Sequence, residues 1–372
     1  MSSPARFRVR RLLPERHRGF TPTLLSVPPP IRVLLSVLLL SIALFSAAGC
    51  AERPKPVLSV GTMPPDLAAV EWTDKARRLW INGAYTDPVT ANSHLTRALE
   101  LSPDDPAILH ARAVALLQLD DRKRAMADLD HAVRVDPEMV AARTLRGRLN
   151  MQNRRYEAAA EDYGAVVAAD PNNTSAYGER GVAEGFMGRY KQALDDLDSA
   201  LALDPSRDDL YFQRATTQVH LDDREAAVHD LTEAISIQPR NALYYSRRGR
   251  LHLYALNLDA ARRDFTAALD LAPANAEAHL GMAQILACSP KERDRDAALA
   301  LEHATAAVQH AAPVTAEYLD ALAAAQAENG DFATAVATEE KALAMAAERE
   351  ADILPILEAH HRLYLDGKPL RF

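Results

Sequence analysis

The chain has 372 residues, of which 48% are hydrophobic and 25% are charged, so it can bury a substantial core and has the charge content of a soluble protein. Only 14 residues are glycine, while Ala, Leu, Arg, Asp and Glu are abundant, which favours helix over sheet. The net charge is −8, but residues 1–50 carry seven Arg and one Glu, a charge of +6, so the remainder carries −14. An acidic body excludes nucleic acid as the main partner, because phosphate contacts need an excess of Lys and Arg.

The first fifty residues have the three parts of a secretory signal. Residues 33–48 form an uncharged apolar run, preceded by an Arg-rich stretch and followed by small residues and Cys50. The run is shorter than the roughly 20 residues that cross a bilayer as a helix. We therefore expect residues 1–50 to be an export signal.

The end of this segment, Ala47-Ala48-Gly49-Cys50, resembles a bacterial lipobox, although Leu is usual at the place of Ala47. The resemblance implies that cleavage leaves Cys50 to carry a lipid, which would tether the protein to a membrane. A residue other than Asp after the cysteine, here Ala51, implies the outer membrane, facing the periplasm. Two alternatives stay open: an uncleaved anchor, or a cleaved signal in which Cys50 is incidental.

Residues 51–71 contain four prolines and show no helical stripe, so we expect a tether. About twenty extended residues reach roughly 60–70 Å.

From here on the chain repeats itself. Prolines stand at 103, 137, 171, 205, 239 and 273, each 34 residues after the one before. If the proline of each copy is called position 32, positions 8 and 20 are always Ala or Gly, and position 24 is large and apolar. Positions 20, 24 and 27 share one helical face, so each copy is predicted to be a helical hairpin that buries this face against a neighbour. The residues at position 24 are Leu129, Tyr163, Leu197, Leu231 and Phe265.

This pattern resembles the tetratricopeptide repeat. The resemblance implies an all-α fold, a right-handed α-solenoid of about eight helical hairpins over residues 72–347, closed by a capping helix and tail at 348–372. Copies start near 72, 106, 140, 174, 208 and 242 in strict phase, although the first helix of the copy at 72 matches poorly. A seventh copy starts near Ala276 and carries about six extra residues, and an eighth starts near Ala316.

Two kinds of turn are expected in each copy. Residue types that tolerate a left-handed backbone stand between the two helices, and an Asp before the repeat proline is expected to cap the next helix, with Pro at its first position. The first set is Asp120, Asn153, Gly188, Asp222 and Asn257, and the second is Asp136, Asp170 and Asp204.

Positions 7 and 23 depart from the family pattern, because position 7 is usually apolar. Here position 7 is always Arg and position 23 always Asp in the five copies from 106 to 273. We predict a ladder of Arg–Asp pairs that fixes how the helices pack, since the guanidinium can meet a carboxylate at two points. A ligand-binding polar seam is the alternative. The ladder consists of Arg112, Arg146, Arg180, Arg214 and Arg248 with Asp128, Asp162, Asp196, Asp230 and Asp264.

The resemblance also implies a ligand surface, the concave face formed by the first helices. In this chain Arg148 and Arg250 could meet an acidic or carboxylate-bearing peptide there. An ordinary solvated groove is the other interpretation. The candidate groove residues are Thr144, Arg148, Gln152, Phe212, Thr216, Ser246, Arg250 and Tyr254.

No common catalytic, nucleotide-binding or metalloprotease motif occurs, so we expect no catalytic residues, no metal and no cofactor. His360 and His361 are expected at the surface, and Cys288 is expected to be a buried small residue or a free thiol. The sequence thus predicts a non-enzymatic scaffold of the bacterial envelope that binds a protein or peptide partner. A chaperone-like or regulatory adaptor in an envelope assembly or secretion machine is the alternative.

Overall fold

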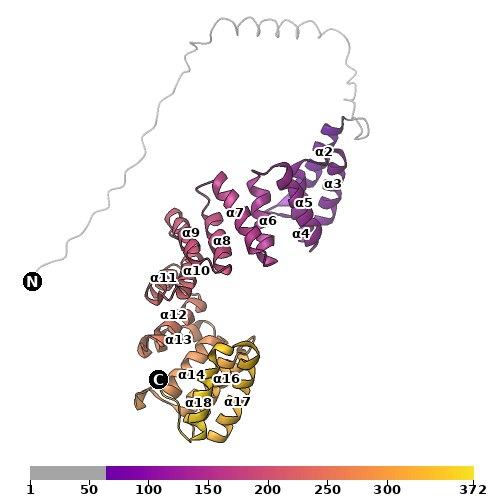
Figure 1. Cartoon of the computed structure of the whole chain (residues 1–372). Coiled ribbons are helices and arrows are strands. Elements are labelled where there is room, and N and C mark those ends of the chain that lie inside the picture. Colours follow the sequence, from indigo (N-terminus) through magenta and orange to yellow (C-terminus); the bar gives the residue numbers. More distant parts are fainter. Residues whose placement is uncertain (1–63) are drawn as a thin grey trace, which may run out of the picture. The chain divides into compact units, whose positions relative to one another are not determined.

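The computed structural model describes residues 64–372, which form one unit made almost entirely of helices (Figure 1). The predicted export signal, Cys50 and most of the predicted tether lie outside the described residues. The first hairpin holds α2 (Pro65–Arg77), β1 (Trp80–Ile81), β2 (Ala84–Tyr85) and α3 (Pro88–Leu101). The next five are α4 (Pro106–Gln118) with α5 (Arg122–Val135), α6 (Val140–Gln152) with α7 (Tyr156–Ala169), α8 (Thr174–Phe186) with α9 (Tyr190–Leu203), α10 (Asp208–His220) with α11 (Arg224–Ile237), and α12 (Ala242–Tyr254) with α13 (Leu258–Leu271). Then follow α14 (Ala276–Cys288), η2 (Glu292–Asp294), α15 (Ala297–His310), α16 (Ala316–Glu328), α17 (Phe332–Arg349), η3 (Ala351–Ile353) and α18 (Leu354–Leu365).

The 34-residue period of the sequence is also the period of the helices. First helices begin at 106, 140, 174, 208, 242 and 276, and second helices at 122, 156, 190, 224 and 258. Each first helix packs against its own second helix, and each second helix packs against the next first helix. The predicted stack of helical hairpins is therefore confirmed for the described residues.

The core lies where the repeat places its small and large apolar residues. Every alanine at position 20, from Ala125 to Ala261, has no exposed surface. The large residues at position 24 are at most 2% exposed in the same five copies. Glycine at position 8 makes room where position 24 is aromatic: a Cβ on Gly147 would lie 3.0 Å from the Tyr163 ring, and one on Gly249 would lie 2.9 Å from the Phe265 ring. Complementary sizes thus allow the two helices of a hairpin to approach closely.

The left-handed residues between the helices follow the period more strictly than residue type does. Asp120, Gly188 and Asp222 have positive φ, as expected, but the other two positions are Arg154 and Leu256 rather than Asn153 and Asn257. The five observed positions are 34 residues apart, so the packed hairpin dictates the turn even where the side chain is unfavourable. Selecting these residues by type alone was wrong by one position in two copies.

The aspartates before the repeat prolines do not cap the following helix. Asp136 is instead the C-terminal cap of α5, and α6 begins only at Val140. Its carboxylate accepts the backbone N–H of Glu138, and Asp170 and Asp204 form the same short turn with residues 172 and 206. The prediction of an N-cap followed by a first-turn proline is wrong, because a four-residue turn separates the helices.

The first hairpin begins earlier than predicted. Helix α2 starts at Pro65, inside the predicted tether of residues 51–71, and buries Ala68, Ala69 and Ala76. A two-stranded hairpin then separates α2 from α3, turning at Asn82 and Gly83, which both have positive φ. Asn-Gly is a strong signal for such a turn. This insertion explains why the first helix of the copy at 72 fits the repeat poorly.

The C-terminal part contains the two irregular copies and the cap. Helix α15 begins 21 residues after α14 instead of 16, and the extra residues hold η2. Helix α18 packs against α17 and α16 and buries Leu357 and Tyr364, so the predicted capping helix is present. None of the helices within residues 64–372 combines the length and the apolar character needed to cross a membrane.

Candidate functional site: the arginine–aspartate ladder and the groove on α10 and α12

The structure brings every arginine of the predicted ladder onto its aspartate. In each pair Nε and Nη2 of the arginine donate to the two carboxylate oxygens, at 2.6–2.9 Å. The aspartates are at most 7% exposed. Two parallel charge-assisted bonds hold both side chains in one geometry, so the pair joins the first and second helix of each hairpin.

The same arginines also reach back to the preceding hairpin. Nη1 of Arg146 donates to Asp130 at 3.0 Å, and Nη1 of Arg214 donates to Asp198 at 2.6 Å. These partners occupy position 25, where Thr96 and Thr232 offer a hydroxyl to Arg112 and Arg248 instead. In the remaining copy position 25 is Gly164, which has no side chain to accept such a bond. The ladder therefore ties neighbouring hairpins together as well as the helices within each one.

Asp162 is the most heavily bonded member of the ladder. It accepts hydrogen bonds from Arg146, Arg143 and Asn150, and it has no exposed surface. The carboxylate of this pair holds the pKa of Arg146 above its usual value, through the hydrogen bonds first and despite burial. A buried pair with every oxygen occupied specifies geometry more than it adds stability.

A groove with a volume of about 510 Å³ lies between the first helices α10 and α12, and we call it the α10–α12 groove. Phe212, Val219, Leu251 and Tyr254 supply apolar surface to it, of which Tyr254 is 56% exposed. A smaller cavity of about 90 Å³ continues it toward α8. The two cavities share Gln213, Thr216 and His220, so one continuous surface crosses three successive first helices.

A charged network closes the far end of this groove. Nη2 of Arg250 donates to Glu317 of α16 at 2.8 Å, and its Nε donates to the hydroxyl of Tyr254 at 2.9 Å. Arg247 donates to Glu277 of α14 at 3.0 Å. Carboxylates from two later hairpins thus already neutralise both arginines, and the open part of the groove is its apolar part.

The eight candidate groove residues fall into three groups. Phe212, Thr216, Arg250 and Tyr254 line the α10–α12 groove together. Ser246 does not: it has no exposed surface, because its hydroxyl donates to the carbonyl of residue 243 and lies 3.2 Å from a carboxylate oxygen of α14. Its assignment as a contact residue was wrong, since the next hairpin covers it.

The other three candidates lie on α6, away from this groove. Arg148 is exposed, and Thr144 is half-buried. The side chain of Gln152 accepts a hydrogen bond from Arg122 of the preceding hairpin, at 2.9 Å. Arg148 and Arg250 therefore do not converge on one ligand position.

A second large cavity, about 610 Å³, lies among α7, α8 and α9 and has a different character. Its lining is mostly charged, and Arg180 and Arg189 within it already pair with carboxylates. It offers no aromatic anchor. The α10–α12 groove is therefore the better candidate for a binding site.

Comparison with protein families decides the nature of the repeat. Two sequence models described as tetratricopeptide repeat match the chain, one over residues 110–174 and 246–287 and the other over residues 208–241. These segments coincide with the hairpins described above. The chain is a tetratricopeptide repeat protein. Proteins with this repeat generally act as non-enzymatic interaction scaffolds, and no curated protein sequence matches this one as a whole.

Solved tetratricopeptide repeat structures resemble parts of this protein in fold. MamA from Desulfovibrio magneticus RS-1, from residue 41 to its end, is 23% identical, covering 46% of this chain and 95% of MamA with a TM-score of 0.43. PilF of Pseudomonas aeruginosa is 18% identical, covering 58% of this chain and 97% of PilF with a TM-score of 0.47. YrrB, titled a TPR protein with an unusual peptide-binding site, is 21% identical, covering 50% of this chain and 95% of YrrB with a TM-score of 0.44.

Several residues escaped the sequence analysis. Val219 and Leu251 line the groove, but an exposed apolar residue on a helix carries no signal that separates it from the core. Cys288 is a free thiol with 1% exposure, and burial raises its pKa, as expected for a structural cysteine. His360 is not a surface residue: it bonds Asp320 beneath the C-terminal cap, beside the buried Glu339.

Proposed function

We propose that this tetratricopeptide repeat protein is a non-enzymatic scaffold that binds a peptide segment of a partner protein in the α10–α12 groove. The observation that carries the proposal is the groove itself. Its walls come from consecutive first helices, and its open part is lined by Phe212, Val219 and Tyr254 with hydroxyl and amide groups beside them. A concave, mostly apolar surface with a few polar groups is what an apolar side chain of a peptide needs.

The chemistry of the groove favours an apolar anchor over a charged one. Arg250 is held by Glu317 and by the hydroxyl of Tyr254, so a peptide carboxylate would have to displace an existing ion pair. Phe212 lies with its ring 5.3 Å from that of Tyr244, which fixes its orientation. A peptide whose apolar side chain enters between Phe212 and Tyr254 gains most, and its polar backbone can meet Gln213 and Thr216.

The experiment compares two variants in a quantitative pull-down. Full-length wild type, Phe212→Ala with Tyr254→Ala, and the control Leu203→Ala are recovered from detergent-solubilised envelopes of the native cells. Leu203 is 40% exposed and ends the second helix α9, outside the groove. A partner recovered in constant ratio with wild type and the control, and lost from the groove variant, supports the scaffold. Equal recovery with all three forms removes the groove from the proposal.

We further propose that the protein is exported and tethered through a lipid on Cys50, at the outer membrane and facing the periplasm. The lipobox-like sequence ending at Cys50 supports this location. Labelling cells with a radioactive fatty acid tests it, with wild type compared to Cys50→Ala. The label is expected on the wild type alone, and label that persists in the variant would exclude Cys50 as the acceptor.

A further inference from the structure

The last helical hairpin, α16 with α17, has a carboxyl group in the middle of its core. Counting the repeat from Ala316 puts Glu339 at position 24, where the five regular copies carry Leu, Tyr or Phe. Like those residues, Glu339 has no exposed surface. Unlike them it is charged when ionised, and neither of its carboxylate oxygens has a hydrogen-bond partner. Burying such a group without compensation is strongly unfavourable.

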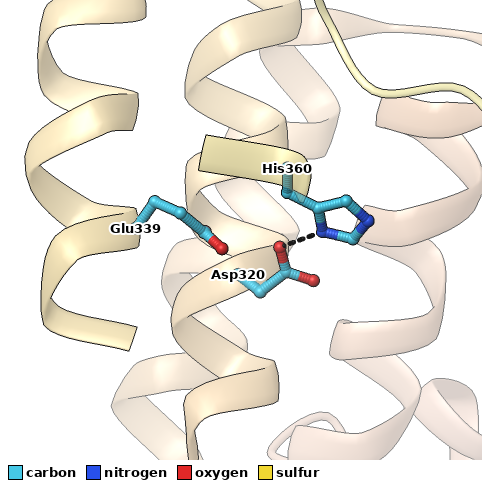
Figure 2. Close-up of side chains that lie close together, drawn as sticks. All are labelled: Asp320, Glu339 and His360. Carbon is cyan, nitrogen blue, oxygen red and sulfur yellow. Dashed lines mark hydrogen bonds and ion pairs between the residues drawn. The ribbon is translucent and has the colours of Figure 1, made fainter. Parts of the chain in front are cut away.

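The buried carboxyl faces two other polar side chains. Asp320 comes from α16 and His360 from α18, and Figure 2 shows Glu339 of α17 pointing toward both of them. One possible ligand atom from each residue lies within 4.8 Å of the other two. His360 Nδ1 is 2.7 Å from an Asp320 oxygen, and their side chains are only 17% and 13% exposed. Three helices thus direct one N and two O ligands at a common point.

The cluster needs positive charge, and its protein surroundings supply little. Burial first, and Asp320 second, raise the pKa of Glu339 to about 9. Burial and the neighbouring Asp320, Cys288 and Glu339 also raise the pKa of Tyr364, whose hydroxyl is buried without a partner. Either a proton or a cation must therefore compensate the two carboxylates. A proton satisfies one oxygen, whereas a divalent cation neutralises both carboxylates and coordinates all three side chains.

We propose that Asp320, Glu339 and His360 bind a divalent transition-metal ion, of which Zn²⁺ is the probe, and that the ion fastens the capping helix α18 to the last hairpin. Carboxylate oxygens and a neutral imidazole are ordinary ligands of zinc at about 2.0–2.2 Å. Ligands of one tetrahedral ion lie about 3.3 Å apart, so the three atoms need only small side-chain rotations to converge. Water takes the fourth position and donates to the hydroxyl of Tyr364. Binding releases the proton that the cluster otherwise holds.

The test uses the full chain without a histidine tag, stripped with a chelator and returned to chelator-free buffer. Zn²⁺ is titrated by calorimetry, and thermal unfolding is followed with and without it. Wild type is expected to bind one equivalent at this site and to unfold at a higher temperature with zinc. Glu339→Gln keeps the shape of the side chain but removes its charge, and should lose this equivalent or bind it at least about tenfold more weakly. The same loss is expected from His360→Gln.

Glu340→Gln is the matched control, because Glu340 is the next residue of α17 and its side chain is 64% exposed. It should bind zinc as wild type does. Zinc bound elsewhere, for example by His279 and His303, whose Nδ1 atoms lie 2.8 Å apart, would survive in Glu339→Gln. Equal zinc binding by wild type and Glu339→Gln would overturn the proposal. So would a wild type that ignores zinc while Glu339→Gln is more stable, because a proton would then be the occupant. Far-UV circular dichroism confirms that each variant folds.

Discussion

The five regular hairpins, from α4 to α13, and the C-terminal part, from α14 to α18, solve the same packing problem in different ways. In the regular hairpins Arg at position 7 and Asp at position 23 form a buried pair in every copy. In the last two hairpins these positions are Met282 with His303 and Leu322 with Thr338. The ladder stops where the strict period stops, after α13.

The difference shows what strict repetition makes possible. When consecutive hairpins are 34 residues apart, every interface has the same geometry, so a single polar pair can be reused at each one. The C-terminal part instead packs alanines tightly: Ala300, Ala304, Ala323 and Ala325 have no exposed surface. Its polar device is a single buried cluster under the cap. Specificity comes from polar geometry in one region and from close approach of helices in the other.

Removing one carboxylate from the ladder should have the largest effect. Asp162→Ala leaves Arg143, Arg146 and Asn150 without their common acceptor in a site that has no exposed surface at the aspartate. We expect a loss of about 3–5 kcal/mol in the free energy of unfolding, the usual cost of stranding one partner of a buried pair. Urea unfolding followed by circular dichroism measures it. The control Glu161→Ala changes an exposed neighbour and should cost less than about 0.5 kcal/mol; equal effects of the two would refute the importance of the ladder.

A single methyl group should disturb the junction between the two regions. A Cβ on Gly281 of α14 would lie 2.2 Å from the ring of Phe265 in α13. Gly281→Ala should therefore destabilise the protein by about 1–3 kcal/mol through overpacking. Gly185 of α8 has open space at the same atom, so Gly185→Ala should be neutral or stabilising, by up to about 1 kcal/mol. Thermal unfolding distinguishes them, and a stabilised Gly281→Ala would contradict the close contact.

The two contacts of one ladder arginine should differ in strength. Arg214 bonds Asp230, whose side chain is 2% exposed, and Asp198 of the preceding hairpin, whose side chain is 61% exposed. In double-mutant cycles we expect a coupling of about 1–3 kcal/mol for Arg214 with Asp230 and about 0.2–1 kcal/mol for Arg214 with Asp198. The second should also fade in high salt. The reverse order would mean that contacts between hairpins, rather than within them, hold the stack together.

The sequence predicts the parts of the structure that depend on the period. Positions 20, 24 and 27 are buried in all five regular copies because a fixed spacing on a helix fixes the face that it presents. The ladder pairs follow for the same reason. The turns show the limit of residue type: Leu256 adopts positive φ, although its neighbour Asn257 is the better residue for it, because the length of the hairpin decides the position.

Contacts between hairpins cannot be predicted in this way. Ser246 is covered by Glu277 of the next hairpin, and Arg250 reaches Glu317 two hairpins further on. Both contacts depend on how side chains fill the space between stacked units. Glu339 is different, because its position in the repeat already marks it as a charged residue in a core place. The six-residue phase shift before α16 hid that signal.

Site-specific photo-crosslinking tests the central claim, that a partner segment lies in the α10–α12 groove, most directly. A photoreactive phenylalanine analogue replaces Phe212 or Tyr254 in the groove, and Leu203 or Ile237 at the ends of second helices, in the full chain within its native cells. The account predicts that the two groove positions crosslink to the same partner, through the same short segment, and that the second-helix positions do not. Crosslinks to that partner from the second helices alone, or no crosslink from either groove position, would contradict it.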